Sequence, residues 1–387
     1  MSKRSTKRVR GFSLMEMVVA TALGTVVVGV AAQLYVQGVN ATWTVSQRAE
    51  MQQDFRAASN MLTKDLSLAG AGLGNGAAIQ LPTSSTIPVY GCDQSTCYLP
   101  LNTPPTTGVK YPQQGGTPYL YGLLTGYNLG PTLSGQNTDI VTVAYSDPSF
   151  YLDCYTASIT SITTVNFVLN ASSTNCTAPN SASIQNINDA AVGLTPGDLV
   201  LFYFTSGANT IPVVAEVYGN ATTPTTATFF PGDPLKMNQA LGVSKSLANQ
   251  YVPFPLTTGY GVRLQVITYY IDNTVTPYRL MRQINGHSPV PVAESTVYLK
   301  FTYDLFNSST NTTATQCQNP GASTDVCYSG SSLGLLPNQI TKINIANMAM
   351  DSSVKGSMYG LAKGNQSIDL QTSVSARNLT YVNSYSQ

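Results

Sequence analysis

The side chains that most often perform catalysis are sparse in this chain of 387 residues. The only histidine, His287, lies in the turn-like sequence Asn285-Gly286-His287-Ser288-Pro289, where we expect a solvated surface side chain. Because a Ser-His-Asp triad or a histidine metal site would depend on this one residue, neither is predicted. The 18 acidic residues show no pairing that indicates sugar hydrolysis, and no G-x-x-x-x-G-K phosphate loop is present. The sequence therefore predicts no enzyme activity, no metal site and no cofactor.

The six cysteines are the second group of residues with chemistry of their own. They form no C-x-x-C pair, so neither a zinc ribbon nor a thioredoxin-like site is indicated. An even number of cysteines in an exported chain predicts disulfides, and buried free thiols are the alternative. Six cysteines allow about 15 pairings, and we expect the three short loops Cys92–Cys97, Cys154–Cys176 and Cys317–Cys327.

A single carboxylate lies near the start of a long apolar segment. Residues 12–32 carry one charge, that of Glu16. As a helix rising 1.5 Å per residue, this segment would be about 31 Å long, which matches the core of a bilayer. An acidic side chain costs roughly 2.5–3.5 kcal/mol at the centre of such a helix and less near an interface. We therefore expect Glu16 to find a partner, such as another subunit.

The segment before the apolar run is basic and sets the orientation of the helix. Because positive flanks stay in the cytoplasm, the rest of the chain is predicted to be translocated. No acidic residue precedes Glu16, and no later segment is a basic tract, so nucleic-acid binding is not predicted. The basic residues of the first ten positions are Lys3, Arg4, Lys7, Arg8 and Arg10.

The junction Gly11-Phe12-Ser13-Leu14-Met15-Glu16, between the basic leader and the apolar run, resembles the class III signal of type IV prepilins and type II secretion pseudopilins. The resemblance implies that a prepilin peptidase removes residues 1–11 by cutting after Gly11. It also implies that the peptidase methylates Phe12, and that Glu16 is the glutamate used in assembly.

Two other signals compete with this interpretation. An ordinary signal-anchor helix would need neither Glu16 nor the Gly11-Phe12 junction. A cleaved secretory signal could end at Val30-Ala31-Ala32, although a glutamate inside its apolar region argues against it.

The helix is predicted to continue beyond the apolar run. Phe55, Ala58, Leu62 and Leu66 recur at three- and four-residue steps and form one apolar face. Glycines from Gly70 onward should end the helix near Ala69. We therefore expect a membrane or filament-core half, residues 12–32, and an amphipathic half, residues 33–70, that packs on a folded head.

The remaining residues, 71–387, predict a β-rich head. Residues 74–137 and 305–335 are rich in Gly, Pro, Ser and Thr, and we interpret both as long surface loops that carry disulfides. The expected fold class is α+β and pilin-like, with a long N-terminal helix packed on an antiparallel sheet. The strands that alternation or apolar runs predict most clearly are 139–145, 198–204, 213–218, 262–271, 297–303 and 340–345.

Several short segments of the head, taken in their order, resemble the PilW family of large minor pilins. Residues 74–137 and 305–335 depart from a compact pilin. The segments that resemble the family are Asp54–Gly70, Thr138–Val143, Pro196–Leu201, Tyr278–Arg282 with Pro291–Glu294, and Ala376–Asn378.

The resemblance implies a structural minor pilin that takes part in type IV pilus assembly near the tip, with an adhesive surface as a further role. Its partners would be the prepilin peptidase, other minor pilins and the major pilin. Residues 12–32 would span the inner membrane once, with the head periplasmic, until the subunit enters the extracellular filament. The alternatives are a minor pseudopilin of type II secretion, a membrane-anchored adhesin that does not polymerise, and a surface enzyme for which the sequence offers no site.

Overall fold

The structure is a computed structural model. Residues 1–12, which comprise the predicted leader 1–11 and Phe12, fall outside the residues it describes. Two compact units divide the chain: Met1–Gln52 with Ser352–Gln366, and Gln53–Asp351 with Ser367–Gln387. The described residues are 13–73, 78–82, 86–101, 106–147, 152–161, 163–169, 186–189, 192–206, 209–223, 225–238, 259–307, 311–320, 337–351 and 367–379.

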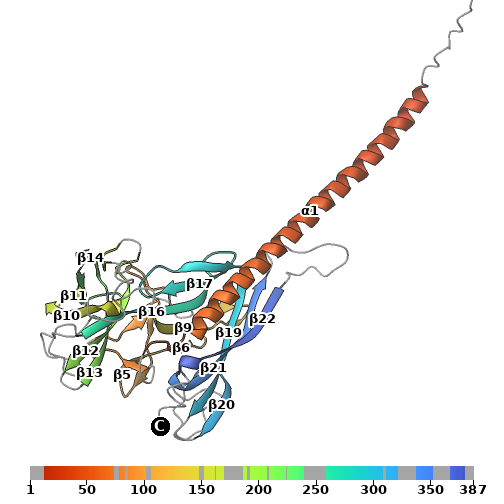
Figure 1. Ribbon diagram of the computed structural model, residues 1–387. Helices are drawn as coiled ribbons and strands as arrows, with labels where there is room; N and C mark the ends of the chain where they lie inside the picture. The colour runs from red at the N-terminus through yellow and green to blue at the C-terminus, as the bar shows by residue number, and fades with distance from the viewer. Residues whose placement is uncertain are drawn as a thin grey trace, which may run out of the picture. The chain divides into compact units, whose positions relative to one another are not determined.

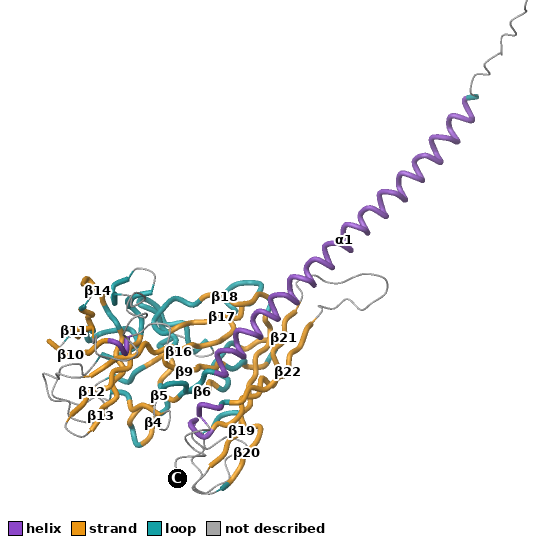
Figure 2. The backbone as a smooth tube through the Cα atoms, in the orientation of Figure 1, coloured by secondary structure: helices purple, strands orange, loops and turns teal. Residues whose placement is uncertain are grey.

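One helix, α1, covers Leu14–Ser67, as Figures 1 and 2 show. The predicted long N-terminal helix is therefore confirmed, and its predicted end near Ala69 is close to the observed one. The chain leaves α1 through Gly70 and Gly72, whose φ angles of 79° and 70° are left-handed and favour glycine. Gly70 also touches Gly122, where an added Cβ would come within 2.5 Å of the Gly70 Cα.

The central sheet of the second unit is antiparallel and is organised around its longest strand, β16 (Gly259–Asp272). The first part of β16 pairs with β12 and its last part with β17, while β9 pairs along residues 263–269. The predicted strands in this region are confirmed as β9, β12, β13 and β16. The other members of the sheet are β6 (Leu123–Gly126), β9 (Ile140–Asp147), β12 (Leu199–Ser206), β13 (Asn209–Glu216), β17 (Arg279–Ile284) and β18 (Val290–Glu294).

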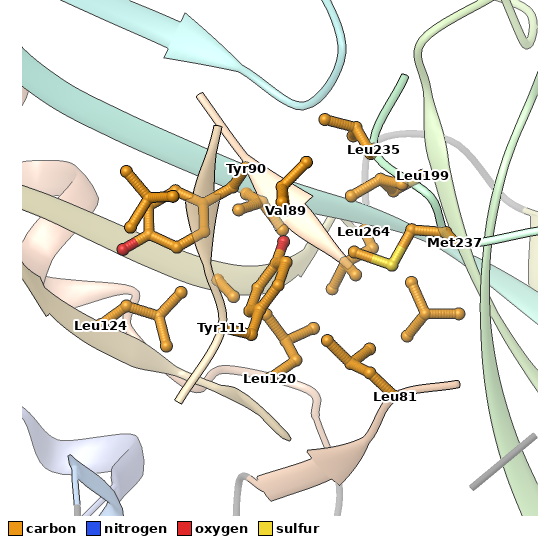
Figure 3. Packing of buried hydrophobic residues seen from close by; sticks show 14 of the residues in the cluster. Leu81, Val89, Tyr90, Tyr111, Leu120, Leu124, Leu199, Leu235, Met237 and Leu264 are labelled. Carbon is orange, nitrogen blue, oxygen red and sulfur yellow. The ribbon is translucent and has the colours of Figure 1, made fainter. Parts of the chain in front are cut away.

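The described parts of residues 74–137 pack on one face of the central sheet or, as β6, join it, so their interpretation as a surface loop is wrong. Tyr111, Leu120 and other side chains of this segment pack with Leu199 and Leu264 of the sheet, as Figure 3 shows. The segment contains strands too short to show a period in the sequence. Its strands before β6 are β1 (Ala78–Gln80), β2 (Val89–Tyr90), β3 (Val109–Lys110), β4 (Gln113–Gln114) and β5 (Thr117–Tyr121), and β7 (Thr132–Leu133) pairs with β8 (Gln136–Asn137) after it.

The opposite face of β12 contributes to a second core. Alternate residues of a strand point to opposite faces, so Leu199 joins the first core while Phe202 and Phe204 join the second. This is why residues 199–204 form an uninterrupted apolar run. A smaller sheet supplies the other wall: β10 (Tyr155–Ser161), β11 (Thr164–Leu169), β15 (Thr226–Thr228) and β14 (Gly219–Thr223).

A separate four-stranded antiparallel sheet forms the C-terminal part of the head, in the order β20-β19-β21-β22. It confirms the last two predicted strands as β19 and β21. It also corrects the loop prediction for residues 305–307 and 312–317, which are strand, while residues 321–335 of that predicted loop lie outside the described residues. Strand β19 continues to Asn307, and β20 begins at Thr312. The four strands are β19 (Thr296–Asn307), β20 (Thr312–Cys317), β21 (Ile340–Asp351) and β22 (Ser367–Ser375).

Candidate functional site

The first turn of α1 is closed by a reciprocal pair of hydrogen bonds. The Ser13 backbone N–H donates to Glu16 Oε2 at 2.9 Å, and the Glu16 backbone N–H donates to Ser13 Oγ at 3.2 Å. This is a capping box, in which a serine and the glutamate three residues later satisfy amides that the helix leaves unpaired. Glu16 therefore has an intrachain role that the sequence analysis missed, although the pattern Ser-x-x-Glu was readable there. Gly11 and Phe12 lie outside the described residues.

The helix that follows Glu16 is apolar and exposed. Within the first unit, residues 14–40 are exposed throughout, including large side chains such as Leu23 and Val28. By length and composition the helix can cross a membrane. An exposed apolar surface of this extent requires a lipid or protein environment.

The last turns of α1, in the second unit, are fixed to the central sheet by a buried ion pair. Arg282 Nε of β17 donates to Asp65 Oδ2 at 2.8 Å, and the Tyr269 hydroxyl of β16 donates to the same oxygen at 2.6 Å. Arg282 Nε also lies 3.1 Å from the Tyr269 oxygen. Burial lowers the pKa of Arg282, but the Asp65 charge and hydrogen bonds outweigh it and raise that pKa.

A family model described as the prokaryotic N-terminal methylation motif matches residues 6–32. The match spans the basic leader, Gly11-Phe12, the capping box and the apolar run. This motif indicates a type IV pilin-like or pseudopilin-like protein. No curated protein and no solved structure matches the chain.

The motif is consistent with the long apolar helix that follows it. A pilin-like chain carrying it is a substrate for a prepilin peptidase and assembles with other pilins. Its apolar helix fits an inner-membrane anchor. Proteins with this motif are generally structural rather than enzymatic.

In the head of this pilin-like chain, three loops meet in a polar corner, which we define by Asp93, Asp198, Glu216 and His287. His287 Nε2 lies 2.9 Å from Asp198 Oδ1, and the histidine side chain is 36% exposed. His287 is therefore partly exposed in a turn, close to the prediction, and it also has a carboxylate partner that the sequence did not predict. Sequence could not reveal this pair, because 89 residues separate its members.

The charge of Asp198 is held by several donors. Arg263 Nη2 lies 3.8 Å from Asp198 Oδ2, and the Thr195 backbone N–H donates to that oxygen at 2.8 Å. Burial raises the pKa of Asp198, but the His287 hydrogen bond, the Thr195 amide and the Arg263 charge together lower it below its ordinary value. The same guanidinium donates to the carbonyl of Gly193 at 2.6 Å, so this cluster fixes the turn before β12.

The disulfide Cys92–Cys97 closes the second loop of the polar corner. Inside this loop, Asp93 Oδ2 accepts hydrogen bonds from Tyr98 at 2.7 Å and from Ser288, beside His287, at 2.9 Å. Burial raises the pKa of Asp93, but these hydroxyls and two loop amides lower it well below its ordinary range. The disulfide loop is thereby joined to the turn between β17 and β18.

The remaining cysteines are only partly described. Cys154 and Cys317 are both disulfide-bonded. Cys176 and Cys327, which we predict as their partners, lie outside the described residues, so these two pairings stay predictions.

Two buried carboxyl groups, those of Glu216 and Asp233, interact at the base of the polar corner. Burial, together with a hydrogen bond and charge repulsion from Asp233, raises the pKa of Glu216 to about 9. Glu216 also accepts hydrogen bonds from Gln94 Nε2 at 2.8 Å and from the Leu235 amide at 3.0 Å. Both carboxyl side chains are enclosed, with exposed fractions of 0% for Glu216 and 2% for Asp233.

No cluster of three or more histidine, cysteine or acidic side chains suited to a metal ion occurs among the described ranges. Hydrogen bonds and ion pairs thus hold the polar groups of the head in place. The methylation motif lies at the N-terminus, in residues 6–32.

Proposed function

We propose that this chain is a minor pilin that takes part in type IV pilus assembly near the filament tip. The observation that carries the proposal is the methylation motif at residues 6–32, followed by a helix, Leu14–Ser67, and an antiparallel β-rich head. In this proposal the peptidase cuts after Gly11 and methylates Phe12. The inner membrane holds the subunit through residues 12–32 until it joins the filament, with the head in the periplasm.

Contacts between distant segments support the PilW-like assignment of the head. Asp65 and Arg282 belong to two of the segments that resemble that family, and they form the ion pair described above. Asn378, in a third segment, donates to the Ser67 carbonyl at the end of α1, with a distance of 3.4 Å. These segments therefore have a common physical task, which is to hold the helix end on the head.

The size of the head supports a place near the tip. Residues 71–387 would follow the helix, and a head of this length is bulky for repeated packing along a thin fibre. A subunit at the tip packs against fewer neighbours than one within the shaft. An adhesive surface on such a subunit would be presented to the environment.

Mass spectrometry of purified filaments tests the proposal. Filaments sheared from cells that produce the native chain should contain it at a small ratio to the major pilin. Its mature N-terminus should be methylated Phe12, and gold-labelled antibodies against the head should mark filament ends. A mature chain that begins at Gln33 would instead support a secretory signal.

The rival assignment, a minor pseudopilin of type II secretion, shares the same N-terminal motif. Deletion of the gene separates the two: a loss of surface pili with normal protein secretion supports the pilin. A loss of secretion with normal pili would support the pseudopilin. A chain found in the membrane but in no filament would support the non-polymerising adhesin.

A further inference from the structure

A polar cleft lies on the C-terminal sheet and shares no residue with the polar corner. Its volume is about 530 Å³, and residues from all four strands line it. Ligand sites are commonly clefts of roughly 300–1,000 Å³, so this one has room for a small ligand. The polar side chains that line it are Thr302, Asp304, Thr315, Gln316, Lys342, Asn344, Gln371, Thr372 and Ser373.

Irregularities in all three strand pairings coincide at this cleft. The register shifts between Tyr303 and Leu305 in the β19–β20 pair, and between Asp304 and Leu305 in the β19–β21 pair. A third shift lies between Ile345 and Met348 in the β21–β22 pair. Bulges bend strands and are over-represented next to functional sites. The cleft is therefore formed by the backbone of the sheet.

Asp304 organises the side chains of the cleft. Its Oδ1 accepts hydrogen bonds from the Gln316 backbone N–H at 3.0 Å and from Asn344 Nδ2 at 3.1 Å. Lys342 Nζ lies 3.8 Å from its Oδ2. Gln316 has a φ of 58°, which is uncommon for a residue other than glycine, and its bond to Asp304 holds it there. The backbone amide of Gln316, which has a positive φ, therefore points toward the carboxylate of Asp304, which lies at a bulge.

The charges and hydrogen-bonding groups of the cleft define the class of ligand. Among the described residues that line the cleft, only Asp304 and Lys342 are charged, and their opposite charges lie 3.8 Å apart. A carboxylate accepts, an ammonium donates, and the amides of Asn344 and Gln371 do both. A ligand complementary to this set is uncharged and carries many hydroxyl groups. Sugars have this chemistry, and the volume accommodates a disaccharide.

We propose that the cleft around Asp304 and Asn344 binds a neutral saccharide. This goes beyond the role in filament assembly, and its failure would leave that role untouched.

The test is titration calorimetry on the full-length chain in a detergent without a sugar headgroup, such as lauryldimethylamine oxide. The probes are lactose, cellobiose, maltose and N,N′-diacetylchitobiose, with glucuronate and glucosamine as charged comparisons. At least one neutral disaccharide should bind, and it should bind more tightly than either charged sugar. Binding of none of these probes would overturn the proposal, as would preferential binding of a charged one.

Matched variants locate the site. Asn344→Ala removes a side-chain amide from the cleft. Gln371→Ala removes a second side-chain amide, and because Gln371 is exposed, this change should not destabilise the fold. Each should weaken disaccharide binding by about tenfold, the effect of losing one or two hydrogen bonds. Asp369→Ala changes an exposed residue of β22 outside the cleft and should bind as the wild type does. Unchanged binding by both cleft variants would overturn the proposal.

Discussion

Asp65 of α1 and Arg282 of β17 are 217 residues apart in the sequence and form a buried ion pair with a 2.8 Å contact. The side chains are 5% and 17% exposed, respectively. The Tyr269 hydroxyl completes the group by donating to the same carboxylate oxygen. One carboxylate on the helix is thereby held by two neighbouring strands of the central sheet.

Arg282→Ala should destabilise the head by about 3 kcal/mol, because it leaves the Asp65 carboxylate buried without its cation. The measurement is guanidinium unfolding of the full-length chain in detergent, followed by circular dichroism. The matched control is Arg279→Ala on the same strand. Arg279 pairs with Glu294 at 3.4 Å on the surface, so its loss should cost less than about 1 kcal/mol. Equal effects of the two changes would contradict a special role for the buried pair.

The carboxyl pair Glu216–Asp233 should lower stability as pH rises. Folded Glu216 keeps its proton up to a pH of about 9, whereas the unfolded chain releases it above about 4.5. The folded state therefore binds more protons in this window, and the free energy of unfolding falls from pH 5 to pH 9 through this group. The raised pKa of Asp233 acts in the same direction.

Glu216→Gln isolates this contribution, because glutamine has nearly the same shape and does not titrate. The free energy of unfolding of the variant, measured relative to the wild type, should increase from pH 5 to pH 9. A relative stability that stays flat across this range would show that Glu216 titrates normally in the folded head.

All six cysteines should form disulfides in the exported protein. Alkylation of the unfolded, unreduced chain should label no thiol, and peptide mapping should recover Cys92 linked to Cys97. Loss of this short loop by Cys92→Ser with Cys97→Ser should cost about 2 kcal/mol in the loop-entropy estimate. Six labelled thiols before reduction would contradict the prediction.

The role of Glu16 can be separated into capping and charge. Glu16→Val removes both, Glu16→Gln keeps a side chain that can complete the capping box, and Ser13→Ala removes the hydroxyl cap but keeps the charge. If the Glu16 charge pairs with the Phe12 amine of a neighbouring subunit, the first two variants should enter filaments poorly and the third nearly normally. Unpaired burial of one charge costs several kcal/mol, so the loss should be large.

Quantitative blotting of membranes and purified filaments provides the readout. Membrane insertion and leader cleavage should survive in all three variants, because Gly11 and Phe12 are unchanged. Wild-type incorporation of Glu16→Gln would contradict charge pairing. Poor incorporation of Ser13→Ala alone would assign the effect to the helix cap.

Local signals in the sequence predicted the long elements well. The apolar run at Leu199–Phe204 and the alternation around Ile140–Tyr145 identified β12 and β9, since each strand carries its own pattern. Strands of two to five residues, such as β2 and β5, leave no such pattern, so the segment that covers the central sheet was misread. Its buried residues, Tyr111 among them, became recognisable only from their packing.

The polar groups were harder to predict, because their partners are distant in the sequence. The pairs Asp65–Arg282 and Asp198–His287 join residues 217 and 89 positions apart. The cleft around Asp304 depends on where strands slip in register, which composition does not encode. The capping box of Ser13 and Glu16 is local, by contrast, and the pattern Ser-x-x-Glu indicates it in the sequence.

The exit of the chain from α1 has a mechanical consequence. Beyond the helix, the Gly70 amide donates to the Ala144 carbonyl and the Ser146 amide donates to the Ala71 carbonyl, both at 2.8 Å. Residues 70–71, the linker after the helix, are therefore hydrogen-bonded to β9. Strand β9 is in turn paired with β16 over seven positions, from Arg263 to Tyr269. Tension that reaches residues 70–71 is therefore passed into a ladder of hydrogen bonds rather than into a single contact. The helix end, the linker and the longest strand of the head would bear a load together, and rupture would require many bonds to fail at once.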